Sequence, residues 1–166
     1  MRPAARLQSA IELLDAIIIA ARDGGASADQ LAKRFFAERR YAGSKDRRAV
    51  RDLAWNAIRR FGERPENARA AFIAMAERDA ELAALFDGSD YGPPAIGVNE
   101  PRSGGGLLPQ WILPHFAALV DENERKALLH RAPLDLRVNA LKTSRDAIAA
   151  EFADAEILPQ SPYALR

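Results

Sequence analysis

The stretch Pro3-Ala-Ala-Arg-Leu-Gln-Ser-Ala-Ile-Glu-Leu-Leu-Asp-Ala-Ile-Ile-Ile-Ala-Ala-Arg-Asp-Gly-Gly25 decides the fold class of this chain. Its apolar residues recur with the i, i+3, i+4 and i+7 spacing of an amphipathic helix. Proline is tolerated in the first turn of a helix, and glycine ends helices because it adopts the left-handed conformation without steric cost. The stretch therefore predicts a helix over residues 3–23 that stops at the glycine pair.

More helices are expected after this one. Ser27 and Gln30 form a capping box, in which each side chain satisfies a free backbone N–H group, so a second helix begins there. Gly43 and Ser44 open a third helix, which Gly62 ends at the C′ position. Two shorter helices are expected over residues 65–78 and 80–86.

Residues 87–106 interrupt the helical pattern, because they hold six of the ten glycines and three prolines. This composition predicts a long loop. A helical stretch follows over residues 109–120. Because an interior proline removes a helix hydrogen bond, we expect either a break at Pro114 or a helix that begins there. Asp121 with Glu124 predicts the cap of a further helix that ends near Arg131.

After Pro133 the spacing of apolar residues changes from the helical period to a period of two, which predicts a strand over residues 134–141. Ser144 caps a helix, and residues 163–165 are typical of another strand. An isolated pair of strands is marginal on its own. We therefore predict a mainly α chain, with a helical domain over residues 1–132 and the truncated start of a small α+β module over residues 133–166.

The composition is that of a globular protein of 166 residues, with 48% hydrophobic and 28% charged residues. The absence of cysteine excludes disulfides, a thiolate nucleophile, a zinc ribbon and an iron–sulfur cluster. Glu12 and Asp15 interrupt the first apolar stretch, so it is not typical of a signal peptide. The uncharged run over residues 103–120 contains glycine and proline, so we expect no membrane helix and predict a cytoplasmic protein.

The net charge of +1 conceals a segregation of charge along the chain. Residues 33–69 hold twelve basic and five acidic residues, a net charge of +7, so the other residues carry −6. Clustered basic side chains bind phosphates and release counterions, and the planar arginine fork suits this contact. The alternative is a solvated helix face on which residues such as Asp46 and Asp52 pair with the arginines.

The remaining candidate sites are weaker, and we predict no catalytic, cofactor-binding or metal-binding residue in the chain. His115 and His130 lack the spacing of metal ligands, so they are expected to be ordinary histidines. The glycine run over residues 104–106 lacks a preceding strand and a following Lys-Ser/Thr pair, so a flexible loop is expected. Trp55 is expected to pack against the third helix's neighbours rather than to stack on a base.

The order of these parts resembles a known family. The segment Gly43-Ser-Lys-Asp-Arg-Arg-Ala-Val-Arg-Asp-Leu-Ala-Trp55, together with Ile58-Arg-Arg60, resembles the NusB-like RNA-binding domain. The segment Arg131-Ala-Pro-Leu-Asp-Leu-Arg-Val-Asn-Ala-Leu-Lys-Thr143 resembles the R-x-N-x-L-K signature of the Sun family of RNA cytosine-C5 methyltransferases. Gln160-Ser-Pro-Tyr-Ala-Leu165 also fits that family, so the resemblance covers essentially the whole chain.

Members of this family methylate C5 of cytosine in ribosomal or other RNA, with S-adenosylmethionine in a Rossmann-like domain and a pair of cysteines. This chain departs from that pattern because it has no cysteine and no glycine-rich loop after a strand. The resemblance therefore implies the N-terminal, RNA-binding region of such an enzyme. This region would dock the enzyme on structured ribosomal RNA, would be inactive alone, and would leave S-adenosylmethionine to the rest of the parent protein.

The residues expected to contact RNA are the basic side chains of the helical domain and the three polar residues of the signature. They are Arg34, Arg39, Arg40, Lys45, Arg47, Arg48, Arg51, Arg59, Arg60, Arg137, Asn139 and Lys142. Two alternatives remain open. One is a free-standing NusB-like antitermination factor, against which the strand and helix after Pro133 argue. The other is a helical protein-interaction module whose basic face meets an acidic partner.

Overall fold

The computed structural model describes residues 1–130 and 132–166, which divide into two units, Met1–Leu129 and His130–Arg166. The division lies close to the predicted boundary at residue 133. Helices provide nearly all of the regular structure in the described residues, and the mainly α class predicted from the sequence is confirmed. None of the helices in these two ranges is both long and apolar enough to cross a membrane.

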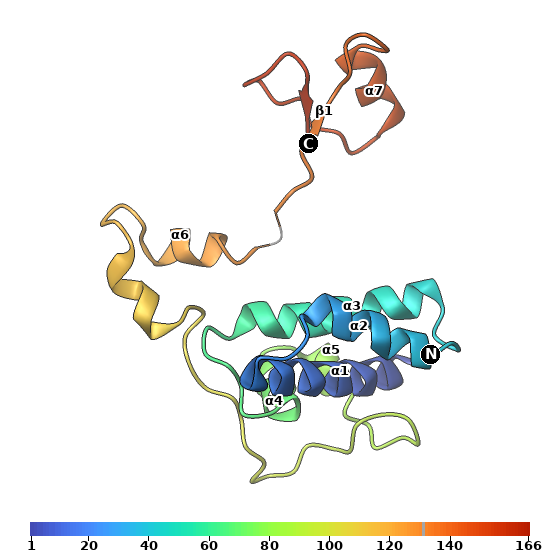
Figure 1. Ribbon diagram of the computed structural model, residues 1–166, viewed down its shortest axis with the longest axis vertical. Helices are drawn as coiled ribbons and strands as arrows, with labels where there is room; N and C mark the ends of the chain where they lie inside the picture. Colours follow the sequence, from blue (N-terminus) through green and yellow to red (C-terminus); the bar gives the residue numbers. More distant parts are fainter. Residues whose placement is uncertain (131) are drawn as a thin grey trace. The chain divides into compact units, whose positions relative to one another are not determined.

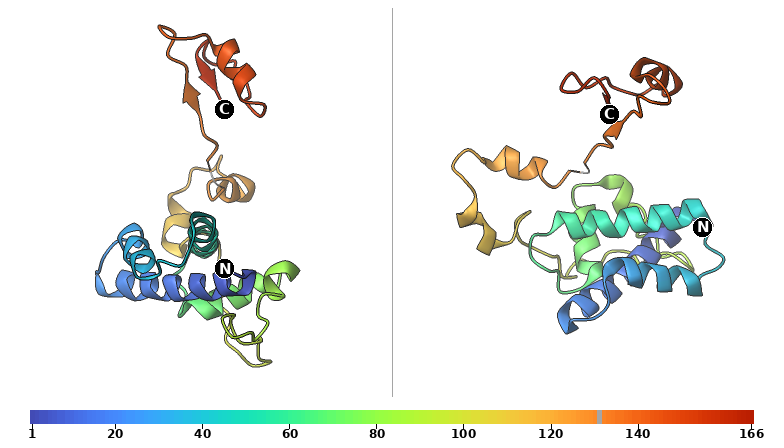
Figure 2. Two further views of the ribbon diagram at one scale, coloured as in Figure 1. Left: turned by 90° about the vertical axis from the view of Figure 1, so that its right-hand side faces the viewer. Right: turned by 45° about the horizontal axis from the view of Figure 1, so that its top comes forward.

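Helix α1 (Pro3–Asp23) is the central element of the first unit. It contacts α2 (Ala28–Glu38), α3 (Ser44–Arg60) and α4 (Ala68–Ala76). Figures 1 and 2 show α2 and α3 on one side of α1, with the loop that follows α5 (Ala80–Ala83) on the other. The predicted ends of α1 are confirmed, because the helix begins at a proline and Gly24 adopts the left-handed conformation with φ 67°.

The core of the first unit is built from α1, α2, α3 and α4. Leu7 and Leu13 of α1 and Phe72 of α4 are completely buried. Ala54 and Ala57 of α3 are also completely buried, and these small side chains allow α3 to lie close to α1. The apolar stripe predicted for residues 3–23 therefore faces the core, as expected for an amphipathic helix.

Side-chain caps set the starts of the shorter helices. The Ser27 hydroxyl accepts a hydrogen bond from the Gln30 N–H at 3.4 Å, so the predicted start of α2 is confirmed. The side-chain oxygen Oδ1 of Asn67 caps α4 by accepting from the Ala70 N–H at 2.8 Å, and the Asp79 carboxylate caps α5 by accepting from the Leu82 N–H at 3.0 Å. The Asn67 cap lies inside the predicted segment 65–78, so α4 begins later than expected, and it also ends earlier, at Ala76. Helix α5 begins at the predicted residue 80 but ends at Ala83, before the expected residue 86.

Gly62 follows α3 at the predicted position, but the reason for glycine there differs from the expected one. Its φ angle is not in the left-handed region. Its N–H donates to the carbonyl of Gly106 at 2.9 Å, and a Cβ atom at this position would collide with the backbone of Leu108. The close approach of a second backbone segment therefore requires glycine at residue 62.

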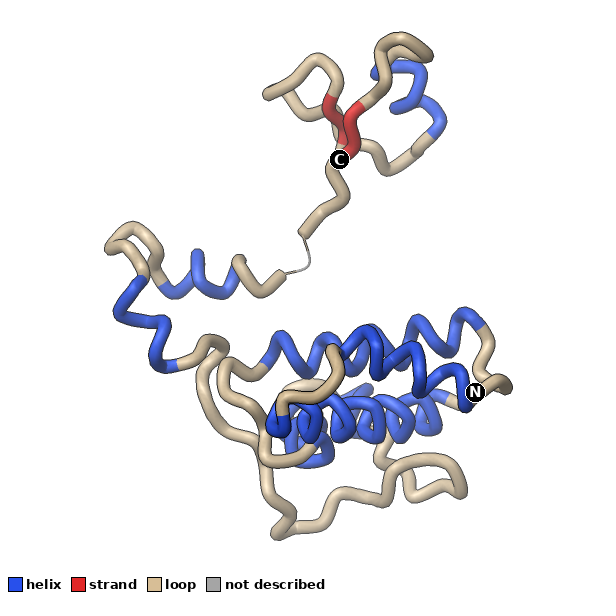
Figure 3. The backbone as a smooth tube through the Cα atoms, viewed as in Figure 1, coloured by secondary structure: helices blue, strands red, loops and turns tan. Residues whose placement is uncertain are grey.

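The predicted loop over residues 87–106 is confirmed, since Figure 3 shows neither helix nor strand there. The helical stretch expected over residues 109–120 is confirmed only in part, because the segment forms the short 3₁₀ helix η1 (Gln110–His115), which ends one residue after Pro114 and does not begin there. Its i to i+3 bonding, seen between the Ile112 N–H and the Pro109 carbonyl at 3.1 Å, tolerates a proline near its end better than an α-helix.

The next helix, α6 (Glu122–Ala127), begins as predicted. The Asp121 carboxylate accepts hydrogen bonds from the N–H groups of Asn123 and Glu124 at 2.8 and 2.9 Å. The helix ends at Ala127, earlier than expected. Arg131, where the predicted helix ends and the quoted signature segment begins, lies outside the described residues.

The second unit contains one helix and one small sheet. Strand β1 (Leu136–Arg137) pairs antiparallel with β2 (Ala164–Leu165), and Leu136 lies opposite Leu165. Helix α7 (Arg145–Glu151) begins at the predicted Ser144 cap. The strand predicted over residues 134–141 is wrong in length, because the chain turns at Asn139 and the partner strand has only two residues.

Candidate nucleic-acid interface

The outer face of α2 carries two cations. Phe35 and Phe36 are buried in the core with their rings edge to face, their centroids 5.3 Å apart. Since successive residues on a helix are turned by 100°, Lys33 and Arg34 then lie on the opposite side. Both side chains are exposed to solvent.

The start of α3 is fixed by Asp46. Its carboxylate accepts hydrogen bonds from the Gly43 N–H at 3.3 Å, from the N-terminal ammonium at 3.1 Å and from the Arg6 guanidinium at 2.9 Å. The hydrogen bond from the ammonium group, followed by that from Arg6, lowers the pKa of Asp46. Asp46 is therefore engaged by α1 and the N-terminus, and it forms no ion pair in the described structure with Lys45 or Arg48 of α3.

Two of the predicted RNA-binding arginines are held at the end of α2 and the start of α3. Arg39 forms an ion pair with Glu12 at 2.9 Å, and its guanidinium lies 3.6 Å from the centre of the Phe35 ring. Arg47 of α3 donates from Nε to the carbonyl of Ala42 in the preceding turn at 2.7 Å, and its guanidinium lies 5.9 Å from the centre of the Phe36 ring of α2. Both arginines are half-buried, so their first role is to join helices of the bundle.

Arg51 and Arg59 also have partners within the protein. The Arg51 guanidinium forms an ion pair with Asp29 of α2 at 2.9 Å and lies 5.5 Å from the centre of the Trp55 ring. Arg59 donates a hydrogen bond to the side chain of Asn56. Trp55 is half-buried against the core, which confirms the expectation that it packs. Part of the basic segment thus behaves as the ion-paired helix face that was the alternative to an RNA-binding surface.

The other cations of α2, α3 and the turn between them are unpartnered. In residues 1–130 and 132–166 no acidic side chain lies within ion-pair distance of them. We call this set the α2–α3 cation cluster, and it consists of Lys33, Arg34, Arg40, Lys45, Arg48 and Arg60. All except the half-buried Arg60 are exposed. Figure 1 shows that the two helices lie on the same side of α1, and the ion pair between Arg51 and Asp29 links them.

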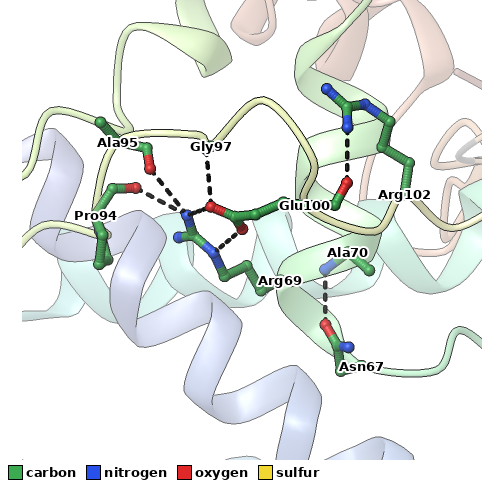
Figure 4. Close-up of polar contacts among 8 residues, drawn as sticks. All are labelled: Asn67, Arg69, Ala70, Pro94, Ala95, Gly97, Glu100 and Arg102. Carbon is green, nitrogen blue, oxygen red and sulfur yellow. Dashed lines mark hydrogen bonds and ion pairs between the residues drawn. The ribbon is translucent and has the colours of Figure 1, made fainter.

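Arg69 also belongs to the basic segment, but its guanidinium is bound by groups of the protein itself. Its guanidinium forms a two-pronged ion pair with Glu100 at 2.6 and 2.8 Å and donates to the carbonyls of Pro94 and Ala95 at 3.1 and 3.2 Å (Figure 4). The Gly97 N–H donates to the same carboxylate at 2.9 Å. Arg69 of α4 therefore fastens the loop over residues 87–106 to the helical bundle.

This contact predicts a pH dependence of stability. The hydrogen bonds from Arg69 and, second, from Gly97 lower the pKa of Glu100 from 4.5 to about 2. Because the folded-state pKa is lowered, the carboxylate stabilises the fold fully above about pH 5, and this stabilisation is lost as the pH falls towards about 2. We expect wild type to melt at a higher temperature than Glu100→Gln at neutral pH, and the difference to shrink across that window. A difference that stayed constant with pH would contradict this account.

The three signature residues lie in the second unit. Asn139 accepts a hydrogen bond from the Leu141 N–H at 3.1 Å, so its side chain shapes a turn. The Arg137 guanidinium lies 5.9 Å from the centre of the Tyr163 ring. Arg137 and Lys142 are exposed. The three residues come from one short segment of the second unit, which begins in β1.

A cleft that the sequence did not single out lies in the first unit. It has a volume of about 890 Å³ and is lined by α1, the turn between α2 and α3, and the loop after α5. Tyr41 and Tyr91 both line it, although they are fifty positions apart in the sequence and remain 71% and 76% exposed. Helical periodicity carries no information about such a site, because both tyrosines lie outside the helices.

The described residues contain no group of acidic or histidine side chains that could hold a metal ion. His115 and His130 are both exposed, in line with the interpretation of ordinary surface histidines. The glycine run over residues 104–106 lies in a loop that no strand precedes in the first unit.

The chain was compared with protein-family models, with curated proteins and with solved structures, and none of them matches it.

Proposed function

We propose that this chain is the RNA-binding N-terminal region of an S-adenosylmethionine-dependent RNA (cytosine-C5) methyltransferase, and that it docks the enzyme on structured ribosomal RNA. The α2–α3 cation cluster is the observation that carries the RNA-binding part of this proposal. All of its side chains except that of Arg60 are exposed, and none has an ion-pair partner within the described residues, so they are available to phosphates. The link to the methyltransferase rests on the resemblance of the signature and of the NusB-like segment.

The cation cluster suits a polyanion because binding requires no rearrangement of the protein. Arg39, Arg47 and Arg51 hold α2 and α3 in place through their contacts within the protein. The helices that carry the unpaired cations are therefore already positioned before RNA binds. Phosphate contacts of this kind give affinity and orientation with little base specificity. RNA helices are recognised mainly through their shape and backbone. Structured RNA is therefore the polyanion that we propose.

The cofactor is not assigned to this chain. In residues 1–130 and 132–166 no glycine-rich turn follows a strand, so the residues present do not fit S-adenosylmethionine. Methyl transfer would belong to a domain other than the two units described here. The function proposed for this chain is binding.

A competition experiment separates RNA docking from the alternative, a protein-interaction module with an acidic partner. A labelled ribosomal RNA fragment is bound to the protein and displaced by unlabelled RNA or by polyglutamate at equal concentration of charge. We expect polyglutamate to displace the RNA at least about ten times less effectively, because phosphates are more closely spaced and release more counterions. Equal displacement would favour the protein-interaction module.

A further inference from the structure

We propose that the cleft between Tyr41 and Tyr91 binds one unpaired RNA base that carries an amino group. This inference rests on the proposed function, because it adds a base-binding subsite beside the α2–α3 cation cluster. Tyr41 directly follows Arg40 of that cluster, so an RNA strand held by the cluster has the cleft within reach of its next nucleotides.

The two tyrosines are the first observation behind this inference. Proteins usually bury much of an aromatic ring, yet Tyr41 and Tyr91 are 71% and 76% exposed. Both border the same cleft from segments far apart in the sequence. Proteins that bind single-stranded nucleic acid stack bases on exposed aromatic rings of this kind.

The charges in the cleft define which part of a nucleotide it accepts. Glu12 and Asp90 line the cleft, and carboxylates repel phosphate but accept hydrogen bonds from the amino group of cytosine. Glu12 is held in place by Gln8, which donates to it at 3.1 Å, and by the ion pair with Arg39. Arg2 lines the same cleft and supplies a positive charge there. We therefore place the base against Glu12 and Asp90, and the phosphate beside Arg2 with the strand continuing towards Arg40. Uracil lacks the amino group and should bind less well.

The wall that carries Tyr91 is fixed before any ligand arrives. The Gly92 N–H donates to the carbonyl of Ser89 at 3.0 Å, and the Gly88 N–H donates to the carbonyl of Pro93 at 3.1 Å. A Cβ atom at Gly92 would come within 2.9 Å of the Ala4 side chain, so this turn packs closely on α1. A preformed wall lowers the entropic cost of binding.

The test compares two RNA ligands that share one stem. The first is a hairpin with a loop of cytidines, and the second is the same stem as a blunt duplex. We expect Tyr41→Ala and Tyr91→Ala each to weaken hairpin binding about tenfold and to leave duplex binding unchanged. The matched variants Tyr41→Phe and Tyr91→Phe keep the ring, so they should bind the hairpin like wild type. A hairpin with a uridine loop should bind wild type several-fold more weakly than the cytidine hairpin.

The outcomes separate this inference from the proposed function. If the alanine variants bind the cytidine hairpin like wild type while Arg34→Glu/Arg48→Glu weakens both ligands, the cleft inference is overturned and RNA docking stands. If wild type binds neither RNA, both are overturned.

A second measurement tests the cleft with single nucleotides, which are too small to span the α2–α3 cation cluster as well. In NMR spectra, cytidine monophosphate should shift the ring resonances of Tyr41 and Tyr91 more than uridine monophosphate does. Tyrosine-lined grooves also bind proline-rich peptides. A proline-rich peptide that shifted these resonances where cytidine monophosphate did not would overturn the inference.

Discussion

Exchange of Arg34 and Arg48 for glutamate is expected to lower the affinity for a ribosomal RNA fragment about 100-fold, because each change removes a phosphate contact and adds repulsion. Both arginines are exposed on α2 and α3 and have no ion-pair partner in the described structure. The folded state should therefore survive the exchange, which a thermal melt close to that of wild type would verify. Affinity is measured by titration of a labelled RNA at fixed salt.

The matched control is Arg22→Glu/Arg78→Glu, which changes the net charge by the same amount. Arg22 lies in the last turn of α1, and Arg78 follows α4, so both are outside α2 and α3. Both are exposed. We expect this variant to lose less than about threefold in affinity, through long-range electrostatics alone. Equal losses in the two variants would show that net charge, and not the α2–α3 cation cluster, governs binding.

Arg47→Glu and Arg51→Glu are less suitable probes, although their spacing on α3 first marks them as phosphate ligands. Arg47 binds the carbonyl of Ala42, and Arg51 joins α3 to Asp29 of α2. Their exchange would disturb the packing of the helices and the surface charge together. A loss of RNA binding in such variants would therefore have two causes.

Phe72→Ala is expected to destabilise the first unit by about 3–5 kcal/mol, because it removes a completely buried ring and leaves a cavity. The lost stability is measured by urea unfolding followed by circular dichroism, with the midpoint reduced and the slope little changed. Trp111→Ala is the control in the same unit, since this ring is 69% exposed and its loss should cost less than about 1 kcal/mol. Similar costs at the two positions would contradict the placement of the core on α4.

The sequence allowed the helical domain to be predicted well where local signals act alone. The apolar spacing of residues 3–23 and the glycine at residue 24 define α1. The caps at Ser27, Asp121 and Ser144 define the starts of α2, α6 and α7. In each case the residue that defines the helix end lies within a few positions of that end, because a capping side chain bonds to the backbone of the first turn.

The sequence was less informative where distant contacts decide the structure. The alternation over residues 134–141 suggested a long strand, but a strand extends only as far as its partner, and Asn139 turns the chain away. The role of Gly62 depends on Leu108, which is distant in the sequence. Local patterns cannot reveal such partners.

The same limit applies to the candidate site. Charge counting identified the basic segment correctly as a concentration of cations, yet spacing on a helix could not separate paired from unpaired side chains. Glu12, Asp29 and Glu100 engage Arg39, Arg51 and Arg69 from other parts of the chain. The cleft between Tyr41 and Tyr91 likewise arises only when the turn after α2 and the loop after α5 meet along α1.

The salt dependence of RNA binding tests the central claim most directly. For wild type we expect the logarithm of the binding constant to fall linearly with the logarithm of salt concentration, with a slope of about four or more. Arg34→Gln/Arg48→Gln should reduce this slope by about two, since each neutralised side chain removes about one phosphate contact. Arg22→Gln/Arg78→Gln should leave the slope unchanged. A wild-type slope near zero, or the same slope in all three proteins, would contradict the assignment of the α2–α3 cation cluster as the RNA-binding surface.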